Sequence, residues 1–462
     1  MRRSGKLLAL VAFGGSALCL AVIPAEAAAR DGRNCRDFRP DGALAAGGQA
    51  AGGQVAKERL AARLVADGEV QAAARALVPV FKNDPQGRTP SGAATLHSAI
   101  GNTALAAAQY ALTEDGARPS FMWTVNAAHC WFGQKVNGSG YGIDNPDSVY
   151  RQTAIDGSSR YVIRGKFNGP APVDTSLVLY GEIPGTGEVR KEGAPVLGGL
   201  TSDQMRIAPD GSFEITVGPD PAGGPNHIQT TSEAKLLIVR DTLSDWSTQN
   251  PPALSISRVD GPAPEPQPDE KALARRTAEL LKAIAPYWLK YNNTYYYQYP
   301  ANRISSPRSR PGALGLATSG RFSLRNDQAL VVTVDRLKGR HLGFQVTDPW
   351  GVARDYPTRT SSLNSDQVRP ETGETATFVI SARDPGVWNW LDTSGLTSGL
   401  MAVRWRGVPA GADTDGAIRS VQVTDLKDLR DHLPAGTVFT DRRERHAQQE
   451  ARAADYERRL TT

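Results

Sequence analysis

The sequence has few of the residues that build metal centres and redox sites. Its 462 residues include six histidines and three cysteines, and none is spaced as a zinc motif or as a helix-borne pair of ligands. The common catalytic motifs are also missing: there is no Gly-x-Ser-x-Gly elbow, no His-Glu-x-x-His helix, no Walker loop and no dinucleotide glycine fingerprint. We therefore expect neither a metal nor another cofactor.

A strong excess of one charge is absent as well. The formal net charge is +5, and charges of both signs are mixed through most of the chain, so nothing here indicates a nucleic-acid partner. Beyond the first 27 residues no apolar run approaches the length of a bilayer span, and we predict no integral membrane span in the mature chain.

Residues 1–27 have the three zones of a secretory signal peptide. The start is basic, residues 7–23 are apolar, and Ala25 and Ala27 fit the small-x-small rule for cleavage. We predict a periplasmic or secreted protein; an uncleaved anchor is the alternative.

Two cysteines, Cys35 and Cys130, remain after the leader. An oxidising compartment allows them to form a disulfide. The alternative is one buried thiol and one thiol in a mobile tail.

Glycine and proline are abundant, with 46 and 31 residues, which indicates many turns. Helical spacing of apolar residues gives way to short strands near residue 140. We predict an α+β chain that is mainly β, with a helical N-terminal region and two jelly-roll or sandwich-like β domains. The predicted segments are the signal peptide 1–27, a disordered lead and helical region 28–140, a first β domain 141–260, a linker and helix 261–310, a second β domain 311–425 and a charged helical tail 426–462 with solvated faces.

Individual elements follow from the same patterns. Helices are expected from Val55 to Gly68, over 69–81 and 92–112, and after an N-cap at Asp269. A loop is expected over 311–320. Strands are expected over 160–165, 175–180, 213–217, 234–240, 254–259, 329–334, 342–346, 376–380 and 400–405.

Three polar clusters are denser than a sheet requires. The first runs from Asp144 to Arg160 and includes Asp147, although Asp and Asn before Pro also serve turns. The second joins Asn226-His227 to Arg240-Asp241, where a structural ion pair is the alternative.

The third cluster combines residues 356–364 with 383–392. Arg, Asn, Asp, Ser and Trp together are typical of a pocket for a polar ligand, and two carboxylates in one cleft could perform acid/base chemistry on a glycoside or ester. The alternative is a loop buttress, with Asp384 capping a turn and Trp390 packed in the core. The candidate catalytic residues are Asp384, Asp392 and Arg359. The candidate substrate-binding residues are Asn364, Asn389, Trp390, Ser362, Asp147 and Arg160.

Long motifs in these regions resemble the bacterial proteins of the domain-of-unknown-function 1214 group. They are Asp144-Asn145-Pro146-Asp147 to Arg160-Tyr161, Asp348-Pro349-Trp350, and Arg383-Asp384-Pro385-Gly386 to Asp392-Thr393. The resemblance covers about residues 140–425 and implies a largely β, jelly-roll-like fold without an agreed reaction. Thr360 stands where an amide side chain is expected, so no role is carried over to that position.

The leading hypothesis is an exported enzyme, a hydrolase or lyase acting on a glycan or lipid of the cell envelope. A non-catalytic protein that binds a carbohydrate or hydrophobic ligand is the competing hypothesis, and an envelope scaffold is a third. A single cleft lined by Asp384, Asp392 and Arg359 would favour catalysis. Carboxylates engaged by backbone turns, together with aromatic side chains on an open face, would favour binding.

Overall fold

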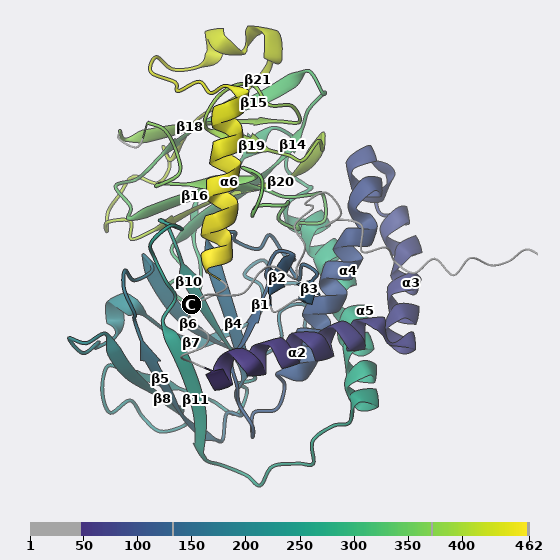
Figure 1. Cartoon of the computed structure of the whole chain (residues 1–462), viewed down its shortest axis with the longest axis vertical. Helices are drawn as coiled ribbons and strands as arrows, with labels where there is room; N and C mark the ends of the chain where they lie inside the picture. Colours follow the sequence, from purple (N-terminus) through teal and green to yellow (C-terminus); the bar gives the residue numbers. More distant parts are fainter. Residues whose placement is uncertain (1–47, 132–133, 371–372, 460–462) are drawn as a thin grey trace, which may run out of the picture.

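The computed structural model describes residues 48–131, 134–370 and 373–459 (Figure 1). The chain is α+β and rich in strand, as predicted, with a layer of helices beside two groups of β-sheets. Within these ranges, none of the helices combines the length and apolar character that a membrane span requires. Cys130 is disulfide-bonded; its predicted partner Cys35 and the predicted signal peptide lie outside the described residues.

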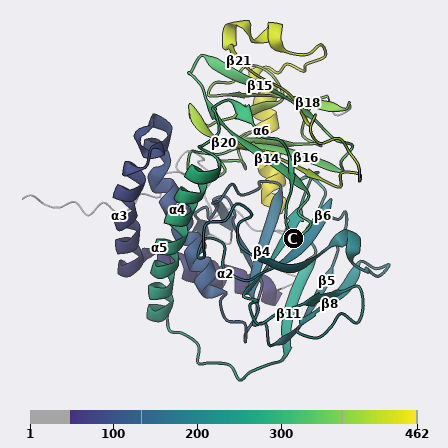
Figure 2. The same cartoon turned by 180° about the vertical axis from the view of Figure 1, so that it is seen from behind.

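Four helices pack together beside the sheets; three of them run side by side at one side of the molecule, and the first runs crosswise to these (Figures 1 and 2). They are α2 (Gly48–Ala66), α3 (Gly68–Asn83), α4 (Pro90–Leu112) and α5 (Glu270–Tyr295). The side chains of Asp67, Thr89 and Asp269 cap the last three by accepting backbone N–H bonds. Two predictions are wrong in detail: α2 begins before Val55, and Gly68 starts α3 rather than ending α2.

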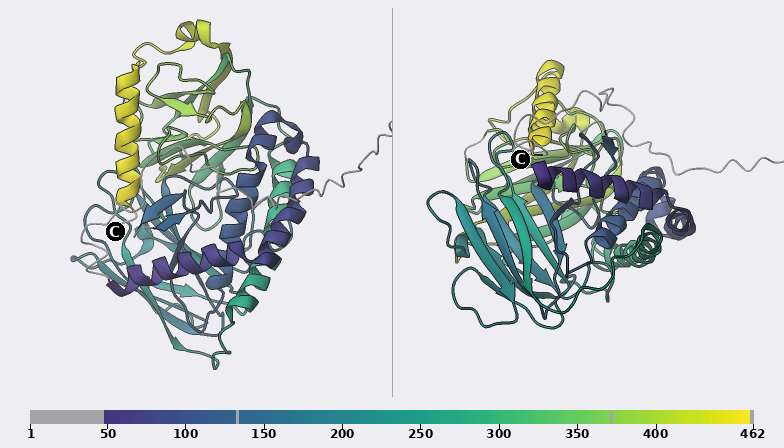
Figure 3. Two further views of the ribbon diagram at one scale, coloured as in Figure 1. Left: turned by 45° about the vertical axis from the view of Figure 1, so that its right-hand side comes forward. Right: turned by 60° about the horizontal axis from the view of Figure 1, so that its bottom comes forward.

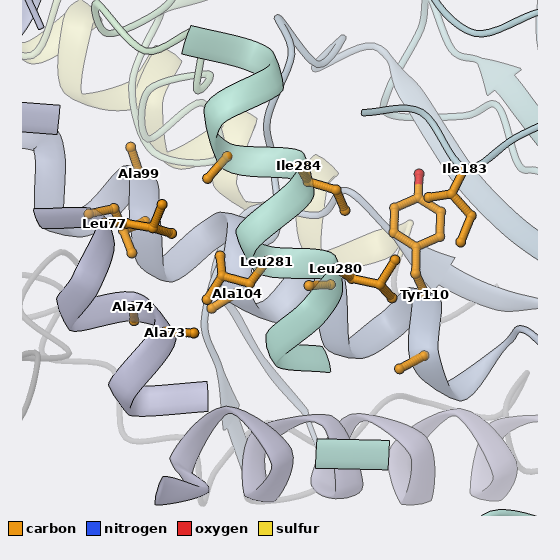
Figure 4. Packing of buried hydrophobic residues seen from close by; sticks show 14 of the residues in the cluster. Ala73, Ala74, Leu77, Ala99, Ala104, Tyr110, Ile183, Leu280, Leu281 and Ile284 are labelled. Atoms are coloured by element: carbon orange, nitrogen blue, oxygen red, sulfur yellow. The ribbon is translucent and has the colours of Figure 1, made fainter. Parts of the chain in front are cut away.

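Small side chains let the helices of this layer approach closely. α4 is rich in alanine, and α5 packs against α3 and α4 although it follows them by more than 150 residues. Ala99 and Ala104 of α4 share one buried cluster with Leu281 and Ile284 of α5 (Figure 4). Tyr180 of the neighbouring sheet joins this cluster, so the helical layer and the sheet share a core.

The first β unit consists of eight strands in two sheets. Its strands are β4 (Ser148–Ala154), β5 (Arg160–Lys166), β6 (Asp174–Tyr180), β7 (Val196–Thr201), β8 (Ser212–Gly218), β9 (His227–Gln229), β10 (Leu236–Thr242) and β11 (Ala253–Asp260). One sheet has the order β4-β10-β6-β7, extended by β1 (Met122–Thr124), and the other has the order β11-β5-β8-β9. Alternating residues such as Ile163, Leu177, Ile215 and Val239 fill the shared core between the two sheets.

The second β unit repeats this arrangement strand for strand. Its strands are β14 (Leu316–Ser323), β15 (Gln328–Asp335), β16 (His341–Val346), β17 (Ser362–Asn364), β18 (Thr375–Ser381), β19 (Trp390–Asp392), β20 (Ser398–Arg406) and β21 (Ile418–Asp425). The sheets have the orders β14-β20-β16-β17 and β19-β18-β15-β21. The sixth strand pairs in parallel with the fifth in both units. The β region is therefore a structural duplication.

Shorter strands complete the sheets and correct one prediction. β12 (Arg303–Ile304) and β13 (Arg308–Ser309) pair with β14, and β2 (His129–Trp131) pairs with β3 (Gln134–Val136). The loop expected over 311–320 is wrong in its second half, where β14 begins at Leu316. Pairing with β20 along its whole length stabilises β14, a tertiary contact that local sequence does not reveal.

The C-terminal tail is not a solvated helix, and that prediction is wrong. α6 (Arg442–Arg458) follows the short helix η4 (Leu426–His432) and lies along both β units (Figures 1 and 3). Arg445, Arg452 and Arg459 are buried. Because a spacing of seven residues is close to two helical turns, the three side chains lie on one face.

Candidate functional site

The two predicted catalytic carboxylates each have partners of their own. Asp384 accepts a turn bond from the backbone N–H of Gly386 at 2.9 Å and pairs with Arg445 of α6 at 2.9 Å. Asp392 accepts from the backbone N–H of Ser394 at 2.8 Å and pairs with Arg359 at 2.8 Å. Burial raises the pKa of Asp392, and the charge of Arg359 opposes that rise.

The aromatic and amide residues predicted beside them support the fold. Trp390 is 5% exposed, donates its indole N–H to the carbonyl of Ser381, and has the Arg445 guanidinium 5.1 Å from its ring. Asn389 bonds through its side chain to the backbone of Arg369 and Thr377. These contacts are those of the loop buttress that was the alternative for this cluster.

Two other predicted residues, 217 positions apart, meet between the β units. Asn364 donates to Asp147 Oδ1 at 2.7 Å, and Trp246 Nε1 donates to the same oxygen at 3.0 Å. His341 Nε2 lies 3.5 Å from Asp147 Oδ2. Burial acts to raise the pKa of Asp147, but the neighbouring His341 ring, the bond from Asn364 and the charge of Arg452 bring it below its usual value.

Gly343 makes room for this contact. A Cβ atom there would lie 2.5 Å from Asp147 Oδ2 and 3.0 Å from His341 Nε2, so the strand can approach the carboxylate only without a side chain. The predicted Ser362 is nearby and accepts from Arg452 at 2.6 Å. Arg160 is not part of this group, because it pairs on an exposed face with Asp220 and Asp260.

A second polar group lies in the same interface; it was not predicted as a group, although Arg240 belongs to the second predicted cluster. We call it the arginine–tyrosine cluster; its members are Tyr110, Tyr141, Tyr150, Tyr180, Arg240, Arg404 and Arg406. The arginines come from the seventh strand of each unit, Arg240 from β10 and the other two from β20. Val239 and Val403 point into the unit cores, so the arginines that follow them point outward to the interface.

Each arginine of the cluster makes contacts across or along the interface. Arg240 donates to the Tyr180 hydroxyl at 3.0 Å and lies 5.6 Å from the ring centres of Tyr150 and Tyr180. Arg404 donates to the Gln345 side chain and the Ile143 carbonyl.

Arg406 of β20 crosses to the first unit, where its Nη1 is 3.7 Å from Asp174 Oδ2. Among the described residues, this is the one salt bridge made by the three cluster arginines. Burial lowers the pKa of Arg406 to about 10, and Asp174 opposes that fall.

Several buried polar atoms in and beside the cluster have no hydrogen-bond partner within the described chain. They are Nη1 of Arg240, Nη1 of Arg406, Oδ2 of Asp174 and Oγ of Ser176. Ser176 lies directly opposite Arg240 in the β6–β10 ladder. Buried donors without acceptors are costly, so the two arginine nitrogens and the Ser176 hydroxyl are suited to receive an acceptor from a ligand.

The tyrosines are suited to donate hydrogen bonds rather than to accept protons. The hydroxyls of Tyr110 and Tyr141 lie 2.6 Å apart. Burial raises the pKa of Tyr110 to about 12 and places that of Tyr141 well above its usual value. Both hydroxyls therefore stay protonated at neutral pH.

A small apolar cavity adjoins the cluster on the helical side. It holds ≈ 10 Å³, about the room for one water molecule, and Tyr141, Trp288, Trp350 and Phe81 are among its lining residues. Gly142 has φ of +63°, and a Cβ there would lie 2.8 Å from the Trp288 ring. The glycine thus allows the loop that carries Tyr141 to pack on Trp288.

Comparison with known proteins gives the fold but no function. No family model and no curated protein matches the chain. The structure is similar to that of an uncharacterized protein from Burkholderia cenocepacia, with a TM-score of 0.58 and 22% identity over 83% of this chain and 99% of that one. The VPA0106 protein from Vibrio parahaemolyticus gives a TM-score of 0.37 at 11% identity over 61% of this chain and 90% of that one.

Proposed function

We propose that this protein is an exported ligand-binding protein that holds the anionic group of a small glycan or amphipathic lipid at the arginine–tyrosine cluster. The supporting observation is an imbalance of charge in one interface: Arg404 and Arg406 are buried, Arg240 is partly buried, and Asp174 supplies their one salt bridge within the described chain. A buried cation without a counter-ion is destabilising. A carboxylate, sulfate or phosphate group would supply the missing charge and acceptors.

Aromatic surfaces in the same place favour a ligand that also carries a ring or an apolar part. The rings of Tyr150 and Tyr180 flank Arg240, and the cavity beside Tyr141 is lined by aromatic side chains. Ligand sites commonly combine apolar walls with a few oriented polar groups. A uronic acid or an anionic lipid headgroup has this combination.

The hydrolase or lyase hypothesis is the second candidate. Its predicted acid/base pair is poorly suited to proton transfer, because Asp384 and Asp392 are held by separate arginines and turn bonds. The tyrosines that could replace them have raised pKa values. Binding without chemistry therefore accounts better for this site.

Export and family membership are part of the proposal. The basic, apolar and small-residue zones of residues 1–27 support a periplasmic or secreted location. The motifs over 140–425 support a relation to the domain-of-unknown-function 1214 group. Each unit has eight strands in two sheets, as a jelly roll does, which supports the predicted jelly-roll topology. That topology remains a prediction.

A binding assay with matched variants tests the proposal. The change in melting temperature is measured with glucuronate, inorganic phosphate and neutral glucose. We expect the two anions to stabilise the protein, and Arg240→Gln to weaken that effect by about 10- to 100-fold in apparent Kd, since a bond to a charged group contributes about 1.5–3 kcal/mol. Arg160→Gln removes an exposed, salt-bridged arginine and serves as the control.

Either of two results would overturn the proposal. One is equal stabilisation by glucose and glucuronate in the unaltered protein. The other is full anion binding by Arg240→Gln together with loss of binding by Arg160→Gln.

A further inference from the structure

We propose that Ser120 and Lys57 form a second site, a serine–lysine pair that transfers the acyl group of an ester to water. Lys57 Nζ lies 2.6 Å from Ser120 Oγ and 3.4 Å from the carbonyl oxygen of Phe121. The lysine belongs to α2, and the serine lies in the segment just before β1. Serine–lysine pairs are an established alternative to the serine–histidine arrangement.

A neighbouring contact fixes the position of the two side chains. Gln54 lies one turn before Lys57 on α2, and its amide exchanges two hydrogen bonds with the main chain of Trp123, at 3.2 and 3.0 Å. Positions i and i+3 share a helix face. Gln54 and Lys57 therefore connect the same face of α2 to residues 120–123. The bonds between Gln54 and Trp123 hold the helix and this segment together, which keeps Ser120 close to Lys57.

The electrostatic setting suits a lysine that works as a base. Within the described chain, Lys57 makes no salt bridge with a carboxylate. Burial lowers the pKa of Lys57 to about 8, so roughly a tenth of its amine is neutral at pH 7. A neutral amine next to a hydroxyl can take its proton when the oxygen attacks.

The pair is open to a substrate, unlike the predicted carboxylate Asp392. Ser120, Phe121 and Lys57 are all partly exposed. The backbone N–H groups of Ser120 and Phe121 donate to no acceptor among the described residues. They are available as donors to the oxyanion that forms when the serine adds to a carbonyl group.

The reaction balances without a cofactor. Ser120 Oγ bonds to the ester carbonyl carbon while its proton passes to Lys57 Nζ. The bond from that carbon to the alcohol oxygen then breaks, and Lys57 gives the proton to the leaving alcohol. Water repeats the attack on the acyl-serine with Lys57 again taking the proton, which releases the carboxylic acid and restores Ser120.

The test uses a fluorophosphonate probe and p-nitrophenyl acetate on the full mature chain. We expect the probe to add to Ser120, as located by peptide mass spectrometry, and ester hydrolysis to rise with pH and reach half of its maximum near pH 8. Ser120→Ala is expected to lose the labelling and at least 100-fold of the enzymatic rate. Ser158, an exposed serine hydrogen-bonded to Asp156, is the internal control and stays unlabelled.

Lys57→Arg separates catalysis from a structural role. Arginine keeps the charge and can still donate to Ser120 and Phe121, but it cannot accept a proton near neutral pH. We expect it to preserve the melting temperature and abolish labelling. Labelling of Lys57→Arg at the original rate, or no labelling of the unaltered protein, would overturn the proposal. Neither result bears on the arginine–tyrosine cluster, with which this pair shares no residue.

Discussion

Asp144 is a buried carboxyl group whose proton affinity depends on the folded state. Burial raises its pKa to about 7, against bonds from the Ala353 N–H and the charge of Arg404 that lower it. Its unfolded value is near 3.8. The folded state therefore binds a proton more tightly than the unfolded state between these two pH values.

This difference predicts a pH dependence of stability. Because the pKa is higher in the folded state, the contribution of Asp144 is fully present below about pH 4 and is lost as the pH rises through about 7. We expect Asp144→Asn to remove this part of the dependence, so that its free energy of unfolding rises relative to that of the unaltered protein as the pH rises. Denaturant unfolding of both proteins at pH 4, 6 and 8 measures it. A constant difference across the three pH values would contradict it.

Gly343 provides a second test at the scale of one residue. A methyl group there would press on the Asp147 carboxylate and the His341 ring, and overpacking typically costs about 1–3 kcal/mol. We expect Gly343→Ala to lower the free energy of unfolding by that amount. Gly198→Ala is the matched control in β7, where the nearest atom would lie 3.8 Å away. Equal effects of the two substitutions would argue against a close contact at Asp147.

Among the helices and strands, α6 contacts both β units through its side chains. Arg452 donates to the carbonyl of Tyr356 and to Ser362, and its guanidinium lies 4.2 Å from the centre of the Trp246 ring. Arg459 reaches the carbonyl of Pro146 in the first unit. The helix thus contributes to the stability of the interface that contains the proposed ligand site.

Removing one of these arginines should reveal that contribution. We expect Arg452→Met to lower the free energy of unfolding by about 2–4 kcal/mol, because several buried acceptors lose their donor. Arg443→Met, at an exposed position of the same helix, is expected to change it by less than about 0.5 kcal/mol. Chemical denaturation measures both. If Arg452→Met changed the free energy of unfolding as little as Arg443→Met, α6 would not stabilise the interface between the units.

The elements that could be predicted are those whose pattern is local. Phe213, Ile215 and Val217 alternate inward along β8, so the strand predicted over 213–217 is confirmed, and Asp210 accepts from the Ser212 N–H in the turn before it. β14 and the buried face of α6 could not be predicted in this way. β14 depends on its pairing with β20, and arginine at positions 445, 452 and 459 is ordinarily a solvated residue whose burial depends on distant aromatic partners.

The residues of the candidate site also divide into those that the sequence could predict and those that it could not. Asp147, Asn364 and Ser362 were predicted from polar density and do gather, because the loop before β4 meets strand β17 where the units pack. Arg240 was noted as half of an ion pair, but Asp241 points into the first unit and pairs with Arg151 there. Successive strand residues face opposite ways, so Arg240 reaches an interface formed by residues more than 150 positions later.

At the scale of the whole molecule, duplication places two equivalent sheets against each other. The sheet that contains β10 meets the sheet that contains β20, and Arg240 and Arg404 come from the same strand of each repeat. Each of these two sheets has a face that points away from its own unit's core, and the two faces are polar where they meet. The part of the first sheet that lies under the helices is apolar. The proposed ligand site therefore lies between the two units and not inside either of them.

Glucuronate and glucose are ligands of similar size that differ in one carboxylate, so isothermal titration calorimetry with both sugars tests whether the interface binds an anion. We predict measurable, enthalpically favourable binding of glucuronate that weakens in Arg406→Gln, and at least a tenfold weaker interaction with glucose. Equal affinity for both sugars, or glucuronate binding unaffected by loss of Arg406 and Arg240 together, would contradict an anion site between the two β units.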